Sequence, residues 1–404
     1  MSTVTDANGA AGLPVFPGER SARCPFDPPS EYAQWREAEG LRKVVWGGHT
    51  VWVVSRLEDI KTAMTDPRVS ADIVGRLQGE ERGEGAPPIF PRMDDPEHAR
   101  LRRMLTKDFT VKRVQAMRPR IQEMVDDFLD QMIDKGQPAD IVRDFALPVP
   151  SLVISLLLGV PYADHELFQR HTAVTMSLHR PQEERTAASA ALFGYLRELV
   201  ARKEAEPGDD LISRLLSEHV AKGDIDRDTV AMNGYLMLNA GHETTANMIA
   251  LSTLFLLRHP DDLARIRDTD DPKVVAGAVE ELLRHLTIVH SLVGRIAVED
   301  VTIGGQLIKA GEGLVINLPA GNRDPEFFPD PDAFDIGRDC RGHVAFGHGT
   351  HQCIGQILAR AELEIALPAL LRRLPDLRLA VPFEELRFRG DMSIYGVHEL
   401  PVTW

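Results

Sequence analysis

Cysteine is scarce in this chain: its 404 residues include only three, Cys24, Cys340 and Cys353. Three dispersed thiols cannot form a disulfide framework, so the sequence predicts a protein of a reducing compartment and a cytoplasmic location. The N-terminal segment has neither a basic start nor an apolar stretch. It therefore does not predict a secretory signal peptide.

Long apolar runs and an excess of basic residues are also missing. The longest apolar run, residues 146–161, contains Pro148 and Pro150 and is shorter than the ~20 residues needed to cross a bilayer. The formal net charge is −15, with 46 lysines and arginines against 61 aspartates and glutamates. Because nucleic-acid binding needs net positive surface, we predict no nucleic-acid partner. Because no apolar run is long enough to cross a bilayer, we also predict no membrane association.

The remaining composition is that of a globular protein, and its patterns predict many helices and few strands. Length alone suggests two or three domains. Residues 1–30 are rich in proline and glycine and predict an extended arm over the surface. Residues 69–92 show no period, so we expect a functional loop there, a candidate lid over a substrate. Helices are predicted over residues 56–65, 94–103, 113–134, 140–158, 192–203, 209–222, 228–258 and 271–286. Strands are predicted over residues 44–54 (a hairpin), 293–298, 301–308, 314–318, 377–381 and 386–388.

The most specific stretch is F-G-H-G-T-H-Q-C-I-G, which contains Cys353. Three glycines, Gly347, Gly349 and Gly355, allow positive φ and close approach of the backbone to a large flat object. A helix is predicted from Gly355 onward, and its N-terminus favours an anionic sulfur at Cys353. Such a thiolate, covered by Phe346, suits axial ligation of a haem iron. The alternative is that Cys353 is a small buried hydrophobe.

Residues 228–258 predict a long helix that is apolar on all sides and therefore runs through the core. Within it, A-G-H-E-T-T (residues 240–245) is out of character. Gly241 costs about 1 kcal/mol in a helix interior, and Glu243 and Thr244 are poor choices for a core. A local widening of the helix beside a ligand would explain these residues. The alternative for Glu243 is a paired carboxylate in the core.

Two further pairs carry little information alone. His98 and Arg102 are four residues apart and share a helix face, which could equally be a solvated basic face. Glu281 and Arg284 are three apart, a spacing too common to indicate a function. His242, His290 and His343 receive no specific role and are interpreted as structural or substrate-side residues.

Four segments occur in an order that resembles the cytochrome P450 family over essentially the whole chain: A-G-H-E-T-T, E-L-L-R, F-D-I-G-R and F-G-H-G-T-H-Q-C-I-G. The resemblance implies a mainly α fold with a small β region (α+β), with a helical core around a buried haem. Because the matching residues extend from 98 to 360 and must meet around one haem, we predict a single domain over residues 1–404, with residues 1–30 as its N-terminal arm.

The resemblance also implies roles for individual residues. Cys353 corresponds to the axial thiolate ligand of haem b (iron protoporphyrin IX). Glu243 and Thr244 match the acid–alcohol pair that delivers protons during dioxygen activation. The expected haem contacts are Phe346, Gly347, Gly355 and Ala240, and the expected partners of the haem propionates are His98, Arg102, Arg295 and His351. Glu281, Arg284 and Arg338 match a structural ion-pair network behind the haem.

The function that the resemblance implies is a haem-thiolate monooxygenase. It would insert one atom of O2 into a hydrophobic, mid-sized to large molecule: a macrolide, a macrolactam or another secondary metabolite, a sterol or a xenobiotic. Electrons would come from NAD(P)H through a ferredoxin and its reductase. The pocket candidates are Met176, Leu178, Leu236, Asn239, Ala240, Val289, His290, Leu292, Ile394 and Tyr395.

Docking of the ferredoxin is expected on a basic segment of this otherwise acidic protein. By resemblance this segment lies on the cysteine side of the haem. Its outward charges are Arg100, Arg103, Lys107, Lys112 and Arg113. An ordinary solvated helix face is the alternative.

Two alternative functions are also compatible with these residues. One is an oxidative ring closure or coupling on the same haem in natural-product biosynthesis. The other is a haem sensor or carrier without turnover. The Glu243–Thr244 pair argues against the second, because a carrier needs no proton relay.

Overall fold

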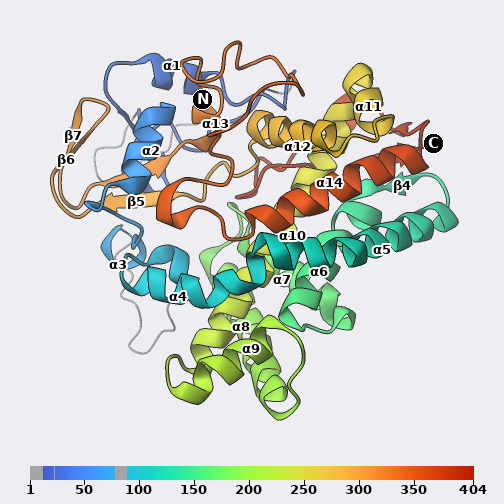
Figure 1. Cartoon of the computed structure of the whole chain (residues 1–404). Helices are drawn as coiled ribbons and strands as arrows, with labels where there is room; N and C mark the ends of the chain where they lie inside the picture. The colour runs from blue at the N-terminus through green and yellow to red at the C-terminus, as the bar shows by residue number, and fades with distance from the viewer. Residues whose placement is uncertain (1–11, 22, 78–88) are drawn as a thin grey trace. The chain divides into compact units, whose positions relative to one another are not determined.

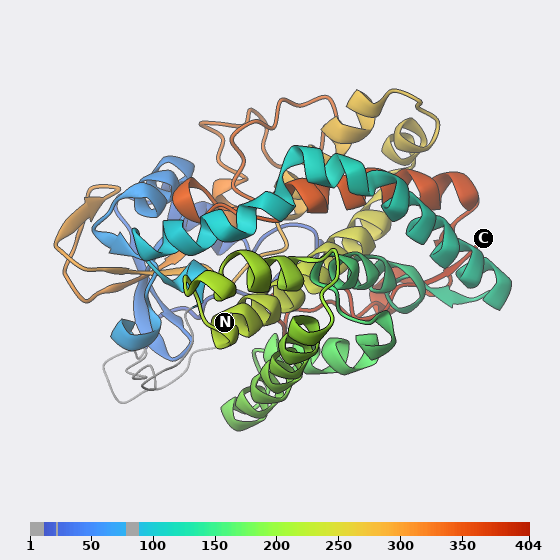
Figure 2. The same cartoon turned by 60° about the horizontal axis from the view of Figure 1, so that its bottom comes forward.

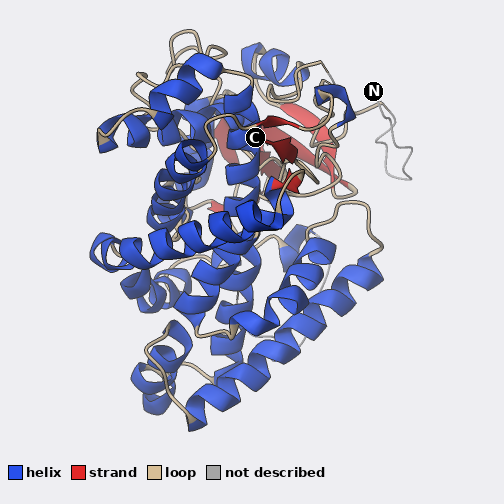
Figure 3. Cartoon of the chain, turned by 90° about the vertical axis from the view of Figure 1, so that its right-hand side faces the viewer, coloured by secondary structure: helices blue, strands red, loops and turns tan. Residues whose placement is uncertain are grey.

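The computed structural model describes residues 12–21, 23–77 and 89–404. Helices make up most of the described chain, and its strands form small sheets of five, three and two strands (Figure 3). This confirms the predicted class, mainly α with a small β region. Among the described residues, no helix combines the length and the apolar character needed to cross a membrane.

The chain divides into two compact units, and each unit is assembled from separate stretches of sequence. The first takes its residues from Met1–Ala86, Phe90–Arg100 and Glu280–Cys353. The second takes Pro87–Ile89, Leu101–Val279 and Ile354–Trp404. The single domain expected over residues 1–404 stays a prediction.

The first unit is built on a five-stranded sheet. Its strand order is β1 (Arg42–Trp46), β2 (His49–Val54), β8 (Gly313–Ile316), β5 (Gly294–Ala297) and β3 (Val69–Ser70). β1 and β2 form the predicted antiparallel hairpin, whereas β2 runs parallel to β8 and pairs Trp52 with Leu314. β6 (Val301–Ile303) and β7 (Gln306–Ile308) form a separate hairpin, also as predicted.

Short helices cover this sheet: α1 (Glu31–Glu37), α2 (Leu57–Thr65), α3 (Val74–Leu77) and α13 (Leu318–Gly321). Leu57 and Ile60 of α2 are fully buried against Leu314 and other apolar residues of the sheet. Most described residues of the N-terminal arm are exposed or half-buried, but Phe16 is 2% exposed and stacks on Tyr32. The aromatic ring removes more apolar area from water in the core than on the surface.

The second unit is helical. Its helices, together with those that the unit boundary crosses, are α4 (Glu97–Thr106), α5 (Val111–Lys135), α6 (Pro148–Leu158), α7 (His165–Thr175), α8 (Gln182–Ala205), α9 (Leu211–Glu218), α10 (Arg227–Leu257), α11 (Pro260–Arg267), α12 (Pro272–Leu286) and α14 (Gln356–Arg373). α5 and α14 lie side by side in both views (Figure 1 and Figure 2). A small sheet joins β4 (Ala139–Asp140), β10 (Pro401–Thr403) and β9 (Arg378–Leu379).

Helix α10 is the centre of the second unit and contacts α6, α8 and α14. Its 31 residues match the predicted helix to within one residue. The Asp226 side chain caps its start by accepting a hydrogen bond from the backbone N–H of Thr229, as an N-cap should. The predicted widening at residues 240–245 is not seen: α10 is a continuous α-helix there.

Other predictions need correction. The helix expected over residues 140–158 is divided into a π-helical turn, Val142–Ala146, and α6, which begins at Pro148 because proline has no N–H to donate and is tolerated in a first turn. α7 and α11 were not predicted. The strand expected at residues 386–388 is reduced to one bridge between Phe388 and Val397. Of the candidate lid, residues 78–88 lie outside the described residues, and β3 and α3 occupy part of the rest.

Candidate active site

A backbone hydrogen bond links the two ends of the loop between Phe346 and Cys353, in the first unit. The backbone N–H of Cys353 donates to the carbonyl of Phe346 at 2.9 Å. Gly349 has a φ of +70°, and a Cβ on it would lie 3.0 Å from the carbonyl oxygen of Met64. Only glycine meets both demands without strain. Gly347 also has positive φ, but Gly355 does not, at −82°. The expectation of positive φ therefore holds for two of the three glycines.

The three cysteines differ in exposure. Cys340 is buried, Cys24 is partly covered and Cys353 is exposed. Burial and the Glu281 carboxylate, which accepts a hydrogen bond from the Cys340 thiol at 3.1 Å, raise the pKa of Cys340 well above its ordinary value. Cys340 is thus held as a thiol. Cys353 is the most exposed of the three thiols.

Glu281, Arg284 and Arg338 form one ion-pair network in the first unit. Arg284 donates to both oxygens of Glu281 at 2.7 Å, and both side chains are fully buried. Arg338 adds a third contact, from Nε to Glu281 Oε1 at 3.2 Å. Burial alone would raise the pKa of Glu281, but the hydrogen bonds and positive charge of Arg284 outweigh burial and hold the pKa below its ordinary value.

This network reaches the segment before the Cys353 loop. Arg284 also donates to the carbonyls of Asn322 and Pro331. The Asn322 side chain in turn accepts from the backbone N–H of Val344 at 2.7 Å. The start of the Cys353 loop is therefore anchored to the ion-pair network.

Three of the expected propionate partners lie in the first unit. His98, at the start of α4, is 1% exposed, and its ring lies 4.0 Å from that of His351. Its Nδ1 is 3.1 Å from Asp95, whereas its buried Nε2 has no hydrogen-bond partner among the described residues. Arg102 follows one turn later on α4, within the second unit.

Arg295 on β5 is a second buried donor. It is 6% exposed, and its one hydrogen bond in the described part of the chain goes to the carbonyl of Gly294. Burial lowers the pKa of Arg295 to about 10, partly offset by the charge of Asp94. A buried guanidinium without a carboxylate in contact is unusual, because desolvation of the charge is left uncompensated.

In the second unit, the largely buried helix α10 has a less covered stripe around Ala240. Ala240 is exposed, and Leu236 and Thr244, one turn before and after it, are half-buried. The Thr244 hydroxyl donates to the carbonyl of Ala240 at 2.8 Å. The neighbouring His242 points elsewhere: it is fully buried against Phe168 and contacts the carbonyl of Leu238. His242 is therefore a structural residue.

Glu243 is a paired carboxylate, which is the alternative that its sequence context left open. Its Oε2 lies 3.0 Å from Nη2 of Arg389. Asn247, one turn further along α10, donates from Nδ2 to the same oxygen at 3.2 Å and to the Glu243 carbonyl at 2.7 Å. All three residues are buried and belong to the second unit.

The sequence pattern did not indicate a role for Arg389 or Asn247. Asn247 had a weak signal, since an amide four residues after a core carboxylate can bond it. Arg389 had none, because it is 142 residues away from Asn247 in sequence.

The substrate-side candidates divide by exposure. In the second unit Met176, Leu178 and Leu236 are half-buried and Ala240 is exposed, whereas Asn239 is buried. In the first unit Leu292 is 44% exposed, Val289 is half-buried and His290 is buried. Ile394 and Tyr395 are 0% and 2% exposed. Tyr395 stacks on Phe388, and the substrate role expected for Ile394 and Tyr395 stays a prediction.

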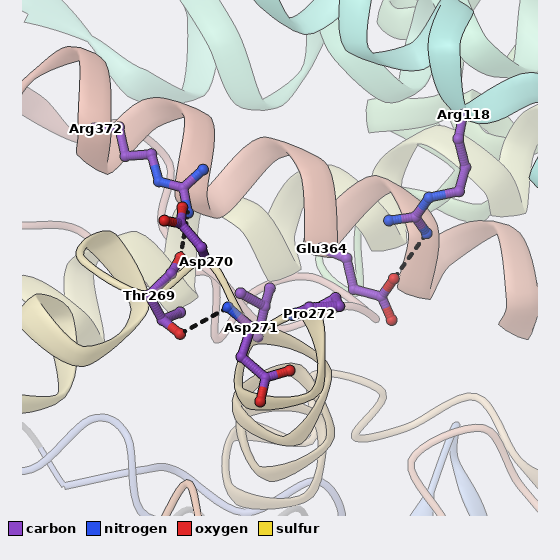
Figure 4. A pocket seen from close by; sticks show the side chains of 8 residues that line it. Arg118, Thr269, Asp270, Asp271, Pro272, Glu364 and Arg372 are labelled. Carbon is purple, nitrogen blue, oxygen red and sulfur yellow. Dashed lines mark hydrogen bonds and ion pairs between the residues drawn. The ribbon is translucent and has the colours of Figure 1, made fainter.

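A separate pocket in the second unit has a volume of about 170 Å³ and lies between α5, α14 and the segment before α12 (Figure 4). Arg118 pairs with Glu364 at 2.7 Å, and Arg372 lies 3.8 Å from Asp270. These charges are satisfied within the protein, so we assign the pocket no function.

The chain matches known proteins along most of its length. The family described as Cytochrome P450 matches residues 36–375. Cytochrome P450-SU2 of Streptomyces griseolus is 54% identical over 396 residues, which cover 96% of this chain and 97% of that protein. The chain belongs to the cytochrome P450 family. This cytochrome P450 is a haem-dependent monooxygenase by its family and its named relatives, which confirms the predicted enzyme class over a non-catalytic haem protein.

Solved structures agree. CYP105P1 in complex with filipin I has a TM-score of 0.90 and 43% identity, covering 97% of this chain and 99% of that one. MycCI of Micromonospora griseorubida, a mycinamicin VIII C21 methyl hydroxylase bound to mycinamicin VIII, has a TM-score of 0.90 and 40% identity, covering 97% and 100%. Both confirm the predicted fold.

The residues of each unit fit a haem. The exposed thiol of Cys353 suits a soft iron ligand. The unpartnered Nε2 of His98 and the buried charge of Arg295 suit the two carboxylates of the haem edge. The small side chains of Ala240 and Thr244, on the less covered stripe of α10, allow close approach of a planar group.

Because of the Glu281 network, we predict that substituting Glu281 destabilises the protein far more than substituting the adjacent Glu280. Glu281→Gln should lower the free energy of unfolding by about 3–5 kcal/mol, because it leaves buried guanidinium groups unpaired. Glu280→Gln is the matched control: Glu280 is 30% exposed and contacts His343, so its loss should cost about 0–1 kcal/mol. Urea unfolding followed by circular dichroism measures both. Equal unfolding midpoints for the two variants would contradict the structural role of Glu281.

Proposed function

We propose that this cytochrome P450 hydroxylates a large hydrophobic secondary metabolite of the macrolide class, with Cys353 as the axial haem ligand and with electrons from NAD(P)H through a ferredoxin and its reductase. The exposure of Cys353 is the observation that carries the proposal. Cys340 is fixed as a protonated thiol by Glu281, and burial and Asp27 raise the pKa of the partly covered Cys24, so Cys353 is the cysteine best suited to a metal.

His98, Arg295, His351 and Arg102 would hold the propionates in this proposal. Buried donors of this kind orient a dianionic group and are themselves relieved of uncompensated burial. The bound haem supplies the activation of dioxygen and the oxygen transfer. The protein's own part is to place the substrate, exclude water and move protons.

Thr244 and Glu243 are proposed to move those protons. The Thr244 hydroxyl lies on the less covered stripe of α10, where it can donate to a bound molecule in place of the Ala240 carbonyl. Glu243 is the adjacent carboxylate on the same helix, and it can resupply a proton through water.

The macrolide class is supported by the relatives. MycCI acts on mycinamicin VIII, and CYP105P1 binds filipin I; both align with 97% of this chain. On this chain the half-buried side chains of Met176, Leu178 and Leu236, with Ala240, offer an apolar surface. Such a surface recognises size and apolar area rather than a charge.

This class is tested by difference-spectrum titration of the purified enzyme with filipin I, mycinamicin VIII, vitamin D3 and small aromatic compounds. At least one of the two macrolides should shift the haem from low to high spin at a lower concentration than the others. If only vitamin D3 or the small aromatic compounds shift the haem spectrum, the macrolide class is wrong and the class of the active compound takes its place.

The cysteine ligand is tested by Cys353→Ser. A hard hydroxyl is a poor substitute for a soft thiolate. The reduced variant under carbon monoxide should therefore lose the long-wavelength absorption band typical of the family. Cys24→Ser should keep it. Retention of the band by Cys353→Ser would remove Cys353 from the site.

The proton role is tested by Thr244→Ala, which should still bind haem and substrate but release more hydrogen peroxide per NAD(P)H consumed. A positioned proton donor contributes about 10²–10⁴-fold to the step that it assists. Thr244→Ser, which keeps the hydroxyl, should recover most of the coupling. An unchanged ratio of product to NAD(P)H in Thr244→Ala would show that this hydroxyl plays no part.

The ferredoxin surface is proposed around the α4–α5 junction, and the ion pairs there refine it. Lys107 is neutralised by Glu218 at 2.7 Å, and Arg113 lies 3.6 Å from Asp209. The exposed charges of Arg103 and Lys112 remain as the main attractants, beside Val111, which is 59% exposed. An apolar residue within a basic patch suits a small acidic protein partner.

Reversal of Arg103 and Lys112 to glutamate should slow reduction by ferredoxin and flatten its dependence on ionic strength, since exposed charges act mainly on association rate. The matched control, Lys222→Glu with Lys273→Glu, changes the net charge equally at exposed positions elsewhere. Stopped-flow reduction measures both. Wild-type rates in the Arg103/Lys112 variant across all salt concentrations would place the docking surface elsewhere.

A further inference from the structure

The Glu243 carboxylate is held by one oxygen only. Arg389 Nη2 lies 3.0 Å from Oε2, and Asn247 Nδ2 donates to the same atom at 3.2 Å. Within the described residues, Oε1 accepts no hydrogen bond. The side chains of Glu243 and Arg389 are 4% and 10% exposed, so solvent competes little for these contacts. The two donors therefore fix the orientation of the carboxyl group and leave one defined oxygen available.

Arg389 is itself held in place by contacts of its backbone and of its second terminal nitrogen. It begins a turn in the C-terminal loop (residues 388–397), where its backbone N–H donates to the carbonyl of Gly396 at 2.9 Å. Its Nη1 also donates to Asn247 Oδ1 at 3.2 Å. A Cβ on Gly396 would collide with that same oxygen. The backbone of the C-terminal loop thus lies directly against Asn247, and a larger residue at 396 would force the two apart.

The opposite edge of the C-terminal loop is tied to the segment that follows α7. The backbone N–H of Ser393 donates to the carbonyl of Met176 at 2.8 Å, and that of Leu178 donates to Asp391 at 2.9 Å. Met176 and Leu178 belong to the proposed substrate surface. Arg389 is therefore anchored by backbone bonds on both edges of its loop, and its guanidinium has little freedom to leave Glu243.

We infer that Arg389 is a positioning residue for proton delivery: it holds Oε2 of Glu243 so that Oε1 is the oxygen that exchanges protons with the Thr244 side of α10. The inference rests on the proposed role of Glu243. It adds a requirement that this role does not contain, namely that the acid works only while the C-terminal loop keeps its orientation fixed.

The main test compares Arg389→Met, Glu243→Gln, the double variant and Arg389→Lys. The product formed per NAD(P)H consumed is measured with filipin I, or with mycinamicin VIII if only that compound shifts the haem spectrum. Arg389→Met and Glu243→Gln should each lower this ratio by about tenfold or more, since a positioned acid contributes about 10²–10⁴-fold. The double variant should be no worse than either single variant, because both changes disable one device. Arg389→Lys should recover most of the ratio.

Two further measurements separate positioning from general damage. The macrolide concentration at half-maximal spin shift should change less than about twofold in every variant, because the substrate surface is untouched. In urea unfolding, the double variant should unfold at no lower concentration than Arg389→Met alone, as expected for two partners of one buried pair. Arg387→Met is the matched control: Arg387 is two residues away, 71% exposed and paired with exposed Glu399, and its loss should change nothing.

The outcomes are distinguishable. If Glu243→Gln keeps wild-type coupling, the proposed role of Glu243 fails, and this inference fails with it. If Glu243→Gln loses coupling while Arg389→Met keeps it, only the inference is overturned. Additive losses in the double variant also overturn it. Should Arg389→Met fail to fold, Asn247→Ala decides: the loss of the second donor to Oε2 should reduce coupling without weakening macrolide binding, and wild-type coupling would refute the inference.

Discussion

The cost of burying a charge governs where this protein places its ionisable groups. An unpaired ion in the interior loses its hydration, and only a well-placed partner compensates. Glu281 meets this demand completely. Its two oxygens receive Arg284, Arg338, the Cys340 thiol and the backbone N–H of Asp335. Because Arg284 continues to Asn322, the saturated carboxylate fixes the segment that leads into the Cys353 loop.

Glu243 is also a buried charge that needs a partner, but it is compensated in a different way. It too is buried and paired with an arginine, but both of its side-chain donors act on Oε2. A carboxylate whose two oxygens both accept hydrogen bonds from the protein supports structure. A carboxylate with one oxygen that accepts none can also exchange protons. The number of contacts on each acid thus distinguishes the Glu281 pair, which supports structure, from the Glu243 pair, which keeps one oxygen available.

His98 and Arg295 show the reverse arrangement. Both are buried donors, and for neither do the described residues supply a carboxylate that would satisfy the remaining capacity of Nε2 or of the guanidinium. Such a pattern is costly in a protein that binds nothing at this place. It is the expected arrangement where a bound molecule brings the acid groups, as a haem does.

The sequence by itself determined the local features. Helix α10 followed from continuous apolar burial over 31 residues, and the β1–β2 and β6–β7 hairpins followed from their paired glycines. The order of four motifs around Cys353 determined the family. Each of these signals lies within one helix or one hairpin, or in the order of motifs along the chain, so none requires knowledge of which distant residues meet. Contacts between distant residues were different. Tertiary structure alone decided that Phe16 lies in the core, that β2 pairs with β8, that Ile394 and Tyr395 are buried and that Arg389 contacts Glu243. A buried ion pair requires only that two side chains meet in space, and no spacing rule connects residues 243 and 389.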